Sequence, residues 1–438
     1  MSSAAAEPNT DLDSIVDNGK ISGLQWTVVF VAFILNMLDG FDVTAMAFTA
    51  HRIGEQLAIP PEHLGLVFSV ALGGMMVGAM FVAPFSDVIG RRKMVLMCVV
   101  VVGISMIATG FSTTLWQLII TRLVTGLGVG GLLASLATIT AEYTPAKYRS
   151  LSVVAITAGY PLGATLGSFV AVPLLEGYGW QSVFLAGGCA TLAMVVVAWF
   201  CLPESIQFLV HRRPAGALET LNKILVRLKA TPLEQMPEEK QSGTQAKANV
   251  LSLLTPDRRA RTIQLWLTFF FCFITLYFLM SWLPKLVVLA GLSESEGVYG
   301  AAAFNGGAVL GILTLGWLAS HIKLSLLISI FLTTTAACML LFGFAAEHLP
   351  MLASLAVIGF FLQGGFTGLY AVAAKVYPVE VRTTGVGWAI GIGRFGAVVG
   401  PFAGGIMIAQ GISMGDNFLV FAIPALVAGL LAWHLKVD

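Results

Sequence analysis

The chain has 438 residues, of which 57% are hydrophobic and only 11% are charged, and its formal net charge is +1 at pH 7. A soluble domain carries about 25% charged residues, so this chain lacks the polar surface that a soluble enzyme or a disordered chain needs. A near-neutral charge without a basic stripe also excludes a nucleic-acid-binding protein. The composition therefore indicates an integral membrane protein that is surrounded by the lipid bilayer.

Runs of about 20 mostly apolar residues, each long enough to cross a bilayer, follow a polar tail at residues 1–23. We place them near residues 24–48, 63–85, 93–111, 116–138, 150–172, 180–202, 264–287, 299–320, 324–345, 350–373, 385–409 and 416–435. These twelve runs predict an all-α membrane protein with two six-helix halves, 24–202 and 264–435. A polar linker at 203–263 joins the halves, and a short tail at 436–438 follows.

Most of the 24 Lys and Arg residues lie on one side of this arrangement, in the linker and in the loops after the second and fourth spans. Because cytoplasmic loops carry the excess of positive charge, we expect both termini to lie in the cytoplasm. Arg52 and Lys285 are the exceptions on the outer side. None of the five cysteines has the spacing of a metal site, and we expect neither a metal nor a cofactor.

The first span carries two acids, Asp39 and Asp42, three residues apart on neighbouring faces of one helix. Counted from an outer end near residue 48, they lie roughly 9–14 Å deep at 1.5 Å per residue. Arg122 lies roughly 9 Å deep in the fourth span, where an unpaired Arg is costly. We expect one of the acids to be its partner. The two acids then serve either as a proton carrier or as part of a purely structural pair.

Arg394 lies about nine residues into the eleventh span, roughly 14 Å from the inner face and close to the middle of the membrane. Its guanidinium can bind a carboxylate through two parallel hydrogen bonds. Because no acid is nearby in the same span, its expected partner is an anionic substrate. The alternative partner is Asp39 or Asp42 in the resting protein.

A shift of 233 residues aligns the two halves, and its clearest matches are glycines and a Pro–Arg pair. Gly73 and Gly74 meet Gly306 and Gly307, and Pro145 and Arg149 meet Pro378 and Arg382. Two halves that run in the same direction are typical of transporters with a substrate site between them. The deep charges have no charged counterpart: Asp39, Asp42, Arg122 and Arg394 align with Cys272, Thr275, Leu355 and Pro161. A charged residue that occurs in only one half points to a function, because a structural role shared by both halves would have a charged counterpart.

Two sequence motifs resemble signatures of the major facilitator superfamily. The stretch Ser86-Asp87-Val88-Ile89-Gly90-Arg91-Arg92-Lys93 resembles the family's cytoplasmic loop signature after the second span. Arg122 with the glycines that follow it resembles the family's fourth-span motif. The resemblance implies that Asp87, Arg91 and Arg92 belong to an inner gate, where Asp87 can form ion pairs with the other half.

A more specific resemblance covers about residues 20–435. Asp39-Gly40-Phe41-Asp42 is similar to the DGxD signature of the aromatic acid:proton symporters within that superfamily. Further matches are Glu142 with Pro145 and Arg149, Leu202-Pro203-Glu204-Ser205, and the stretch 377–385 with Glu380 and Arg382. The resemblance implies transport roles for the acids of the first span and for Arg394, and gating-loop roles for Glu142, Arg149, Glu380 and Arg382.

Side chains within the spans can form the wall for an aromatic ring or bind its substituents. The candidates are Phe41, Tyr160, Phe273, Tyr277, Tyr370, Trp388, Phe395, Asn305 and Gln363. Our hypothesis is a monomeric proton-coupled symporter, not an enzyme, that imports a benzoate, hydroxybenzoate, protocatechuate or gentisate across a bacterial inner membrane. The alternatives are a symporter for another organic acid, an exporter that exchanges its substrate for protons, and a membrane receptor for aromatic acids.

Overall fold

The computed structural model of the chain describes residues 21–237, 250–345, 349–377 and 381–435. These residues form helices and no strand, and twelve of the helices are long and apolar enough to cross a membrane. The predicted fold class, an all-α membrane protein with twelve transmembrane helices, is therefore confirmed.

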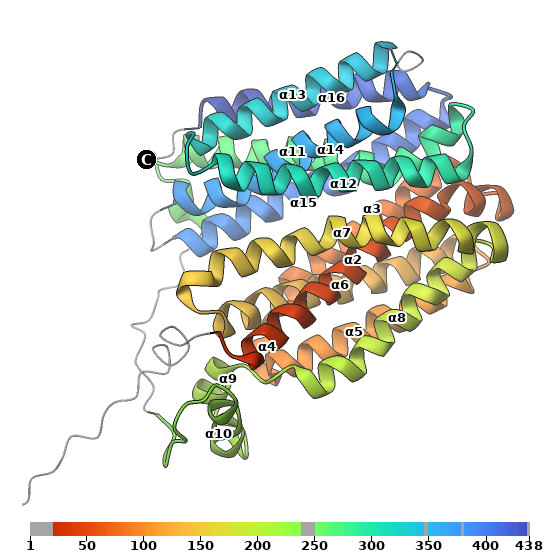
Figure 1. Cartoon of the computed structure of the whole chain (residues 1–438). Coiled ribbons are helices and arrows are strands. Elements are labelled where there is room, and N and C mark those ends of the chain that lie inside the picture. Colours follow the sequence, from red (N-terminus) through yellow and green to blue (C-terminus); the bar gives the residue numbers. More distant parts are fainter. Residues whose placement is uncertain (1–20, 238–249, 346–348, 378–380, 436–438) are drawn as a thin grey trace, which may run out of the picture.

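The helices form two groups of six spans, which lie beside each other in Figure 1. The N-terminal half contains α2 (Gly23–Gln56), α3 (Pro61–Val77) with η1 (Gly78–Val82), η2 (Ala83–Phe85) and α4 (Ser86–Ile89), α5 (Arg91–Gly110), α6 (Leu115–Tyr143), α7 (Ala146–Tyr178) and α8 (Trp180–Cys201). The C-terminal half contains α11 (Arg259–Leu289), α12 (Glu294–Leu318), α13 (Leu324–Ala345), α14 (Met351–Val376), α15 (Arg382–Ala409) and α16 (Met414–Trp433).

The linker contains the short helices α9 (Ile206–Arg212) and α10 (Ala217–Arg227) and the turn η3 (Val250–Leu253). In α10, Leu221, Ile224 and Leu225 are buried, as the helical spacing of apolar residues predicts. Figure 1 shows α9 and α10 at one end of the bundle. We call this the linker end and the opposite end, where α2 finishes and α12 begins, the far end.

Several helices extend beyond the predicted spans. Helix α2 continues eight residues past the predicted end at 48, and α11 begins within the predicted linker. An apolar window marks only the part of a helix that suits hydrocarbon, and polar residues such as Arg52 carry α2 further, where they find partners. Asp39 and Asp42 therefore lie about two turns further from the end of the helix than from the predicted end of the span at 48, and their depth in the membrane stays a prediction.

The two halves share one pattern of close helix packing. Glycines bring helix backbones into contact, and a Cβ at any of them would overlap the backbone of the neighbouring helix. The matched contacts, separated by 233 residues, are Gly74–Leu123 with Gly307–Ala356, Gly78–Leu127 with Gly311–Phe360, and Gly163–Met37 with Gly396–Phe270. The tertiary structure thus confirms the internal repeat.

The halves contact each other in the centre and at the far end. At the far end, Gly65 of α3 lies against Pro401 and Gly405 of α15, and Arg52 of α2 forms an ion pair with Glu294 of α12. Aromatic contacts join Phe68 to Trp282 and Phe169 to Tyr299. These contacts close the space between the halves on the far side.

Candidate functional site

The partner of Arg122 is Asp42. The two side chains are buried, and Nη1 of Arg122 lies 2.9 Å from Oδ1 of Asp42. Nη2 donates a hydrogen bond to Oγ1 of Thr109 at 2.7 Å, and the guanidinium lies 5.2 Å from the ring of Phe184. The structure thus brings together the predicted acid and base. Thr109 and Phe184 were not predicted, since nothing in an apolar helix marks one Thr or Phe among many.

A small cavity adjoins this ion pair. Its volume of about 30 Å³ is enough for one water molecule. Asp42 and Arg122 line it together with Leu72 of α3 and Ser281 of α11. The ion pair and its partners Thr109 and Phe184 belong to the N-terminal half, and the cavity beside them reaches Ser281 of the other half.

Asp39 has no partner of this kind. Its side chain is 3% exposed, and neither carboxylate oxygen accepts a hydrogen bond from any residue that the structure describes. It lies within electrostatic range of Asp42 and Arg394. A buried carboxylate without donors is costly to keep ionised, so this group is either neutral in this conformation or prepared for a partner that arrives.

Arg394 of α15 lies within electrostatic range of Asp39. It is half-buried, its Nη1 is buried without a hydrogen-bond partner, and it forms no ion pair with a described residue. The alternative in which it pairs directly with Asp39 or Asp42 is therefore not realised in this conformation. A guanidinium held within an apolar helix bundle with an unused N–H group can receive the carboxylate of a ligand.

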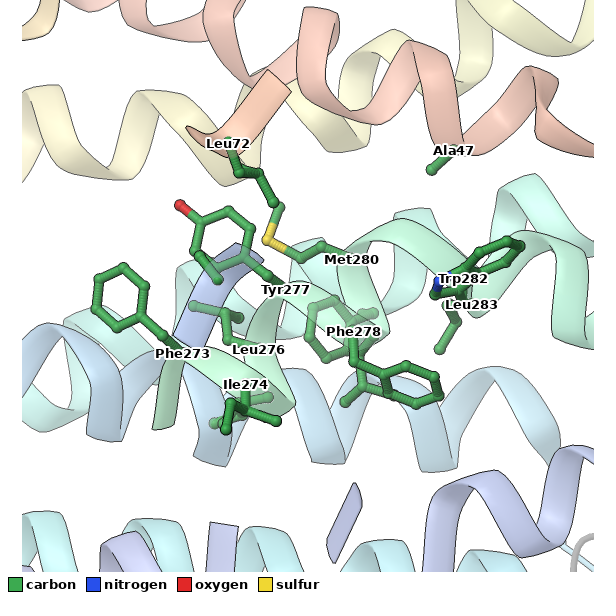
Figure 2. Packing of buried hydrophobic residues seen from close by; sticks show 14 of the residues in the cluster. Ala47, Leu72, Phe273, Ile274, Leu276, Tyr277, Phe278, Met280, Trp282 and Leu283 are labelled. Atoms are coloured by element: carbon green, nitrogen blue, oxygen red, sulfur yellow. The ribbon is translucent and has the colours of Figure 1, made fainter. Parts of the chain in front are cut away.

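Three tyrosines lie near this cation. Tyr160 of α7, Tyr277 of α11 and Tyr370 of α14 each lie within electrostatic range of Arg394. The hydroxyl of Tyr160 is buried and unpaired, and Tyr277 stacks on Phe273 with ring centroids 5.6 Å apart. Figure 2 shows Tyr277 and Met280 pointing from α11 toward Leu72 in the other half. These rings form an aromatic wall beside an acid and a base.

Two amide side chains in the spans are also buried. Asn305 of α12 donates from Nδ2 to the carbonyl of Ala301 at 2.9 Å, while its Oδ1 has no partner. Gln363 of α14 lies with Nε2 3.9 Å from Sδ of Met280, a weak contact. Both keep hydrogen-bonding capacity for a ligand.

Three predicted aromatic residues do not join this cluster. The ring of Phe41 packs against Gly167 and Gly187 inside the N-terminal half. Phe395 is 52% exposed, and Trp388 stacks on Trp266. Both lie about 100° or more around α15 from Arg394, since successive helix residues turn by about 100°. Their expected role as the ring wall has no support here, because sequence proximity to a charged residue does not place a side chain on the same helix face.

The predicted gate residues at the linker end form a network within the N-terminal half. Asp87 is largely exposed and lies 3.2 Å from Arg91 of its own loop. Arg91 also bonds to Glu142 and to Ser205. The backbone N–H of Arg92 donates to Glu204 at 3.0 Å. The expected ion pair between Asp87 and the other half does not occur among the described residues.

The turn within this network needs glycine. Gly90 has φ of +104°, and a Cβ there would overlap the carboxylate of Glu204. The Leu-Pro-Glu-Ser element after α8, which was predicted only as a motif, therefore contributes Glu204 and Ser205 to this network. Glu380 lies outside the described residues, and the side chains of Arg149 and Arg382 do so as well.

The far end holds an ion pair that was not predicted as a site. Nε of Arg52 donates to Oε2 of Glu294 at 2.6 Å, and the same guanidinium bonds to the carbonyl of Leu175. Lys285 is buried nearby, close to Gly54 of α2. The sequence offered one sign of this ion pair: Arg52 and Lys285 are the two cations that the charge distribution places on the outer side.

Comparison with known proteins agrees with this arrangement. The Major Facilitator Superfamily model matches residues 30–324 and 299–438. A gallate transporter of Pseudomonas putida is 33% identical over 423 residues, which cover 96% of this chain and 94% of that protein. The 4-hydroxybenzoate transporter PcaK of Acinetobacter baylyi is 32% identical over 436 residues, covering 98% and 94%. The inward-open structure of the xylose transporter XylE from E. coli has a TM-score of 0.75 at 17% identity, covering 94% and 96%.

Proposed function

Because the chain belongs to the Major Facilitator Superfamily, it is a multi-pass membrane transporter and not an enzyme, and we propose that it imports an aromatic carboxylate together with protons. Two relatives that match nearly its full length are named as transporters of gallate and of 4-hydroxybenzoate. The observation that carries the proposal is a group of side chains from both halves: Arg394 without a partner among the described residues, Asp39 without a donor among them, and three tyrosines within electrostatic range of Arg394.

Arg394 is the proposed carboxylate site. Its free N–H group offers the geometry in which a guanidinium binds both oxygens of a carboxylate. Tyr277 and Tyr370 lie within electrostatic range, so a ring attached to that carboxylate meets aromatic faces and edges. Offset and edge-to-face contacts between aromatic rings add to the free energy of burial. An aromatic acid thus satisfies both parts of the site.

Asp39 is the proposed proton carrier. Its burial without hydrogen bonds favours a state in which it holds a proton or meets a cation. Arg394 is the cation within range, and a substrate carboxylate at Arg394 would take that cation away. Binding of the anion and of the proton would then support each other, which is the coupling that a symporter requires. Asp42 forms an ion pair with Arg122 beside this site.

The conformation fits a state that is closed on the outer side. The described contacts between the halves lie at the centre and the far end. If the linker and both termini lie in the cytoplasm, as the distribution of Lys and Arg favours, the closed far end faces outward. Rocking of the halves would then expose Arg394 and Asp39 to each side in turn. The higher pH inside would remove the proton and release the substrate.

Uptake by cells that express the protein tests this proposal. The labelled substrates are benzoate, 4-hydroxybenzoate, protocatechuate and gentisate, each with and without a protonophore. We expect accumulation of at least one acid, its loss with the protonophore, and its loss in Asp39→Asn. Asp257→Asn is the matched control, because Asp257 is an exposed residue of the linker. Uptake that survives the protonophore would rule out proton coupling, and no uptake of any acid would rule out the substrate class.

A further inference from the structure

Asn305 of α12 holds an unused hydrogen-bond acceptor inside the protein. The side chain is 1% exposed, and its Nδ2 donates to the carbonyl of Ala301 one turn earlier, at 2.9 Å. Exchanging the two ends of the amide would set two acceptors against each other, so Nδ2 stays with the helix. Oδ1 is then left buried with no donor, a costly arrangement unless a ligand supplies one.

The internal repeat shows where this acceptor points. Asn305 corresponds to Leu72, which lies 233 residues earlier and lines the cavity beside Asp42 and Arg122. Figure 2 shows Leu72 facing α11 across the space between the halves. The helices on which the two residues lie also cross to the other half in the same way. Ser69 bonds to the carbonyl of Val398 at 2.7 Å, and Thr165 to that of Ala302 at 3.5 Å.

Those two contacts are also one repeat apart. Helix α12 therefore meets α7 as α3 meets α15, and Asn305 takes the place of Leu72 on the helix face toward the central space. A polar residue stands there in one half and an apolar residue in the other. Such a difference between equivalent positions is not required by the shared packing of the two halves.

The depth of Asn305 follows from its neighbours on α11. Gly297 of α12 packs against Pro284 of α11, and the two helices run in opposite directions. Asn305 lies eight residues further along α12, which brings it level with Leu276, next to Tyr277. The unused acceptor is thus at the height of the tyrosine that lies within electrostatic range of Arg394.

Arg394 lies nearer the linker end, on a helix that runs along α11. Gly396 and Gly400 of α15 meet the backbone of Phe270 and Ile274, which places Arg394 eight residues of α11, about 12 Å along the axis, from the level of Asn305. The ring of Phe273 contacts Gly393 and stacks on Tyr277, so the aromatic wall links the two heights. The two groups are carried by α12 and α15, which both pack on α11. A cation and an acceptor therefore face the same aromatic wall from two sides.

We infer that Asn305 recognises a hydroxyl group on the substrate ring, opposite the carboxylate that Arg394 binds. This inference rests on the proposed function and adds which ring the site prefers. The hydroxyl donates its proton to Oδ1, while a carboxylate would be repelled by the same oxygen, so the substrate can enter in one orientation only. A ring without a donor leaves the acceptor buried and unpaired, and a site built to hydrogen-bond a hydroxyl rejects the analogue that lacks it.

Competition against labelled 4-hydroxybenzoate tests this inference in cells that express the full chain. The competitors are unlabelled 4-hydroxybenzoate, benzoate, 4-fluorobenzoate and 4-aminobenzoate. Fluorine is small and cannot donate, whereas the amino group can. We expect the hydroxy and amino acids to inhibit uptake at concentrations about tenfold lower than benzoate and the fluoro acid, the ratio expected for one hydrogen bond to a buried group.

Replacing the amide identifies the residue responsible. Asn305→Leu installs the side chain that the other half has at Leu72, and we expect it to bring the four inhibitory concentrations within about twofold of each other. Asn417→Leu is the matched control. Asn417 is also buried, bonds to its own helix turn through Nδ2 and leaves Oδ1 unpaired, but it lies at the start of α16. It should retain the tenfold preference.

The outcomes separate this inference from the proposed function. If the unchanged protein takes up none of the four labelled acids of the uptake test, the proposed function itself is overturned. Uptake of labelled benzoate without uptake of labelled 4-hydroxybenzoate would overturn the inference alone. Uptake with equal inhibition by the hydroxy and fluoro acids would overturn the inference alone, and this comparison needs no variant. A tenfold preference that persists in Asn305→Leu would show that another group reads the hydroxyl.

Discussion

Changing Asp42 to Asn removes the charge that balances Arg122, while the shape of the side chain stays nearly the same. The two charged atoms lie 2.9 Å apart and both side chains are buried. At an effective dielectric constant of about 20, their attraction is about 6 kcal/mol. Asn can still accept a hydrogen bond from Arg122, so the loss is smaller, about 3–5 kcal/mol, as for other buried pairs that lose one partner. Native proteins are stable by about 5–15 kcal/mol, so this is a large fraction.

Thermal unfolding of the purified protein in detergent measures this effect. We expect Asp42→Asn to unfold at a clearly lower temperature, and a double variant with Asp42→Leu and Arg122→Met to recover most of the loss, because well-packed apolar residues can replace a buried pair. The double variant should nevertheless fail to accumulate substrate. An Asp42→Asn protein as stable as the unchanged one would refute the electrostatic reasoning, and accumulation by the double variant would show that the pair is only structural.

Three further outcomes are expected. Arg52→Gln breaks the pair with Glu294 at the far end and should lower the free energy of unfolding by about 1 kcal/mol or less, because the pair is partly exposed. It should also speed hydrogen exchange at the far ends of α3 and α15. Unchanged exchange would show that the pair does not hold this side closed. Gly163→Ala places a Cβ against the backbone of α2 and should lower the melting temperature, whereas Gly177→Ala on the same helix meets open space; equal melting temperatures would contradict the packing argument. Arg394→Lys keeps the charge but loses the planar fork, so KM should rise about tenfold or more with expression unchanged; an unchanged KM would place the carboxylate elsewhere.

The number of spans, the two halves and their repeat could be predicted from the sequence alone. Each depends on a property that a segment has by itself, such as an apolar run as long as a bilayer or a glycine where two backbones meet. The pairing of Arg122 with an acid of the first span could also be predicted, because a cation buried in hydrocarbon needs a partner. Asp39 and Asp42 were the acids at comparable depth.

The tertiary structure decided which acid pairs and which remains unpaired. Asp39 and Asp42 are three residues apart, and one turn of helix is enough to send them to different neighbours, since the groups around each come from helices distant in sequence. The same reason separates Asn305 from Asn417, which have the same local bonds but lie in different surroundings, and keeps Phe41 away from the ring wall. Local sequence determines how far along a helix a side chain stands, but the packing of the other helices determines what it faces.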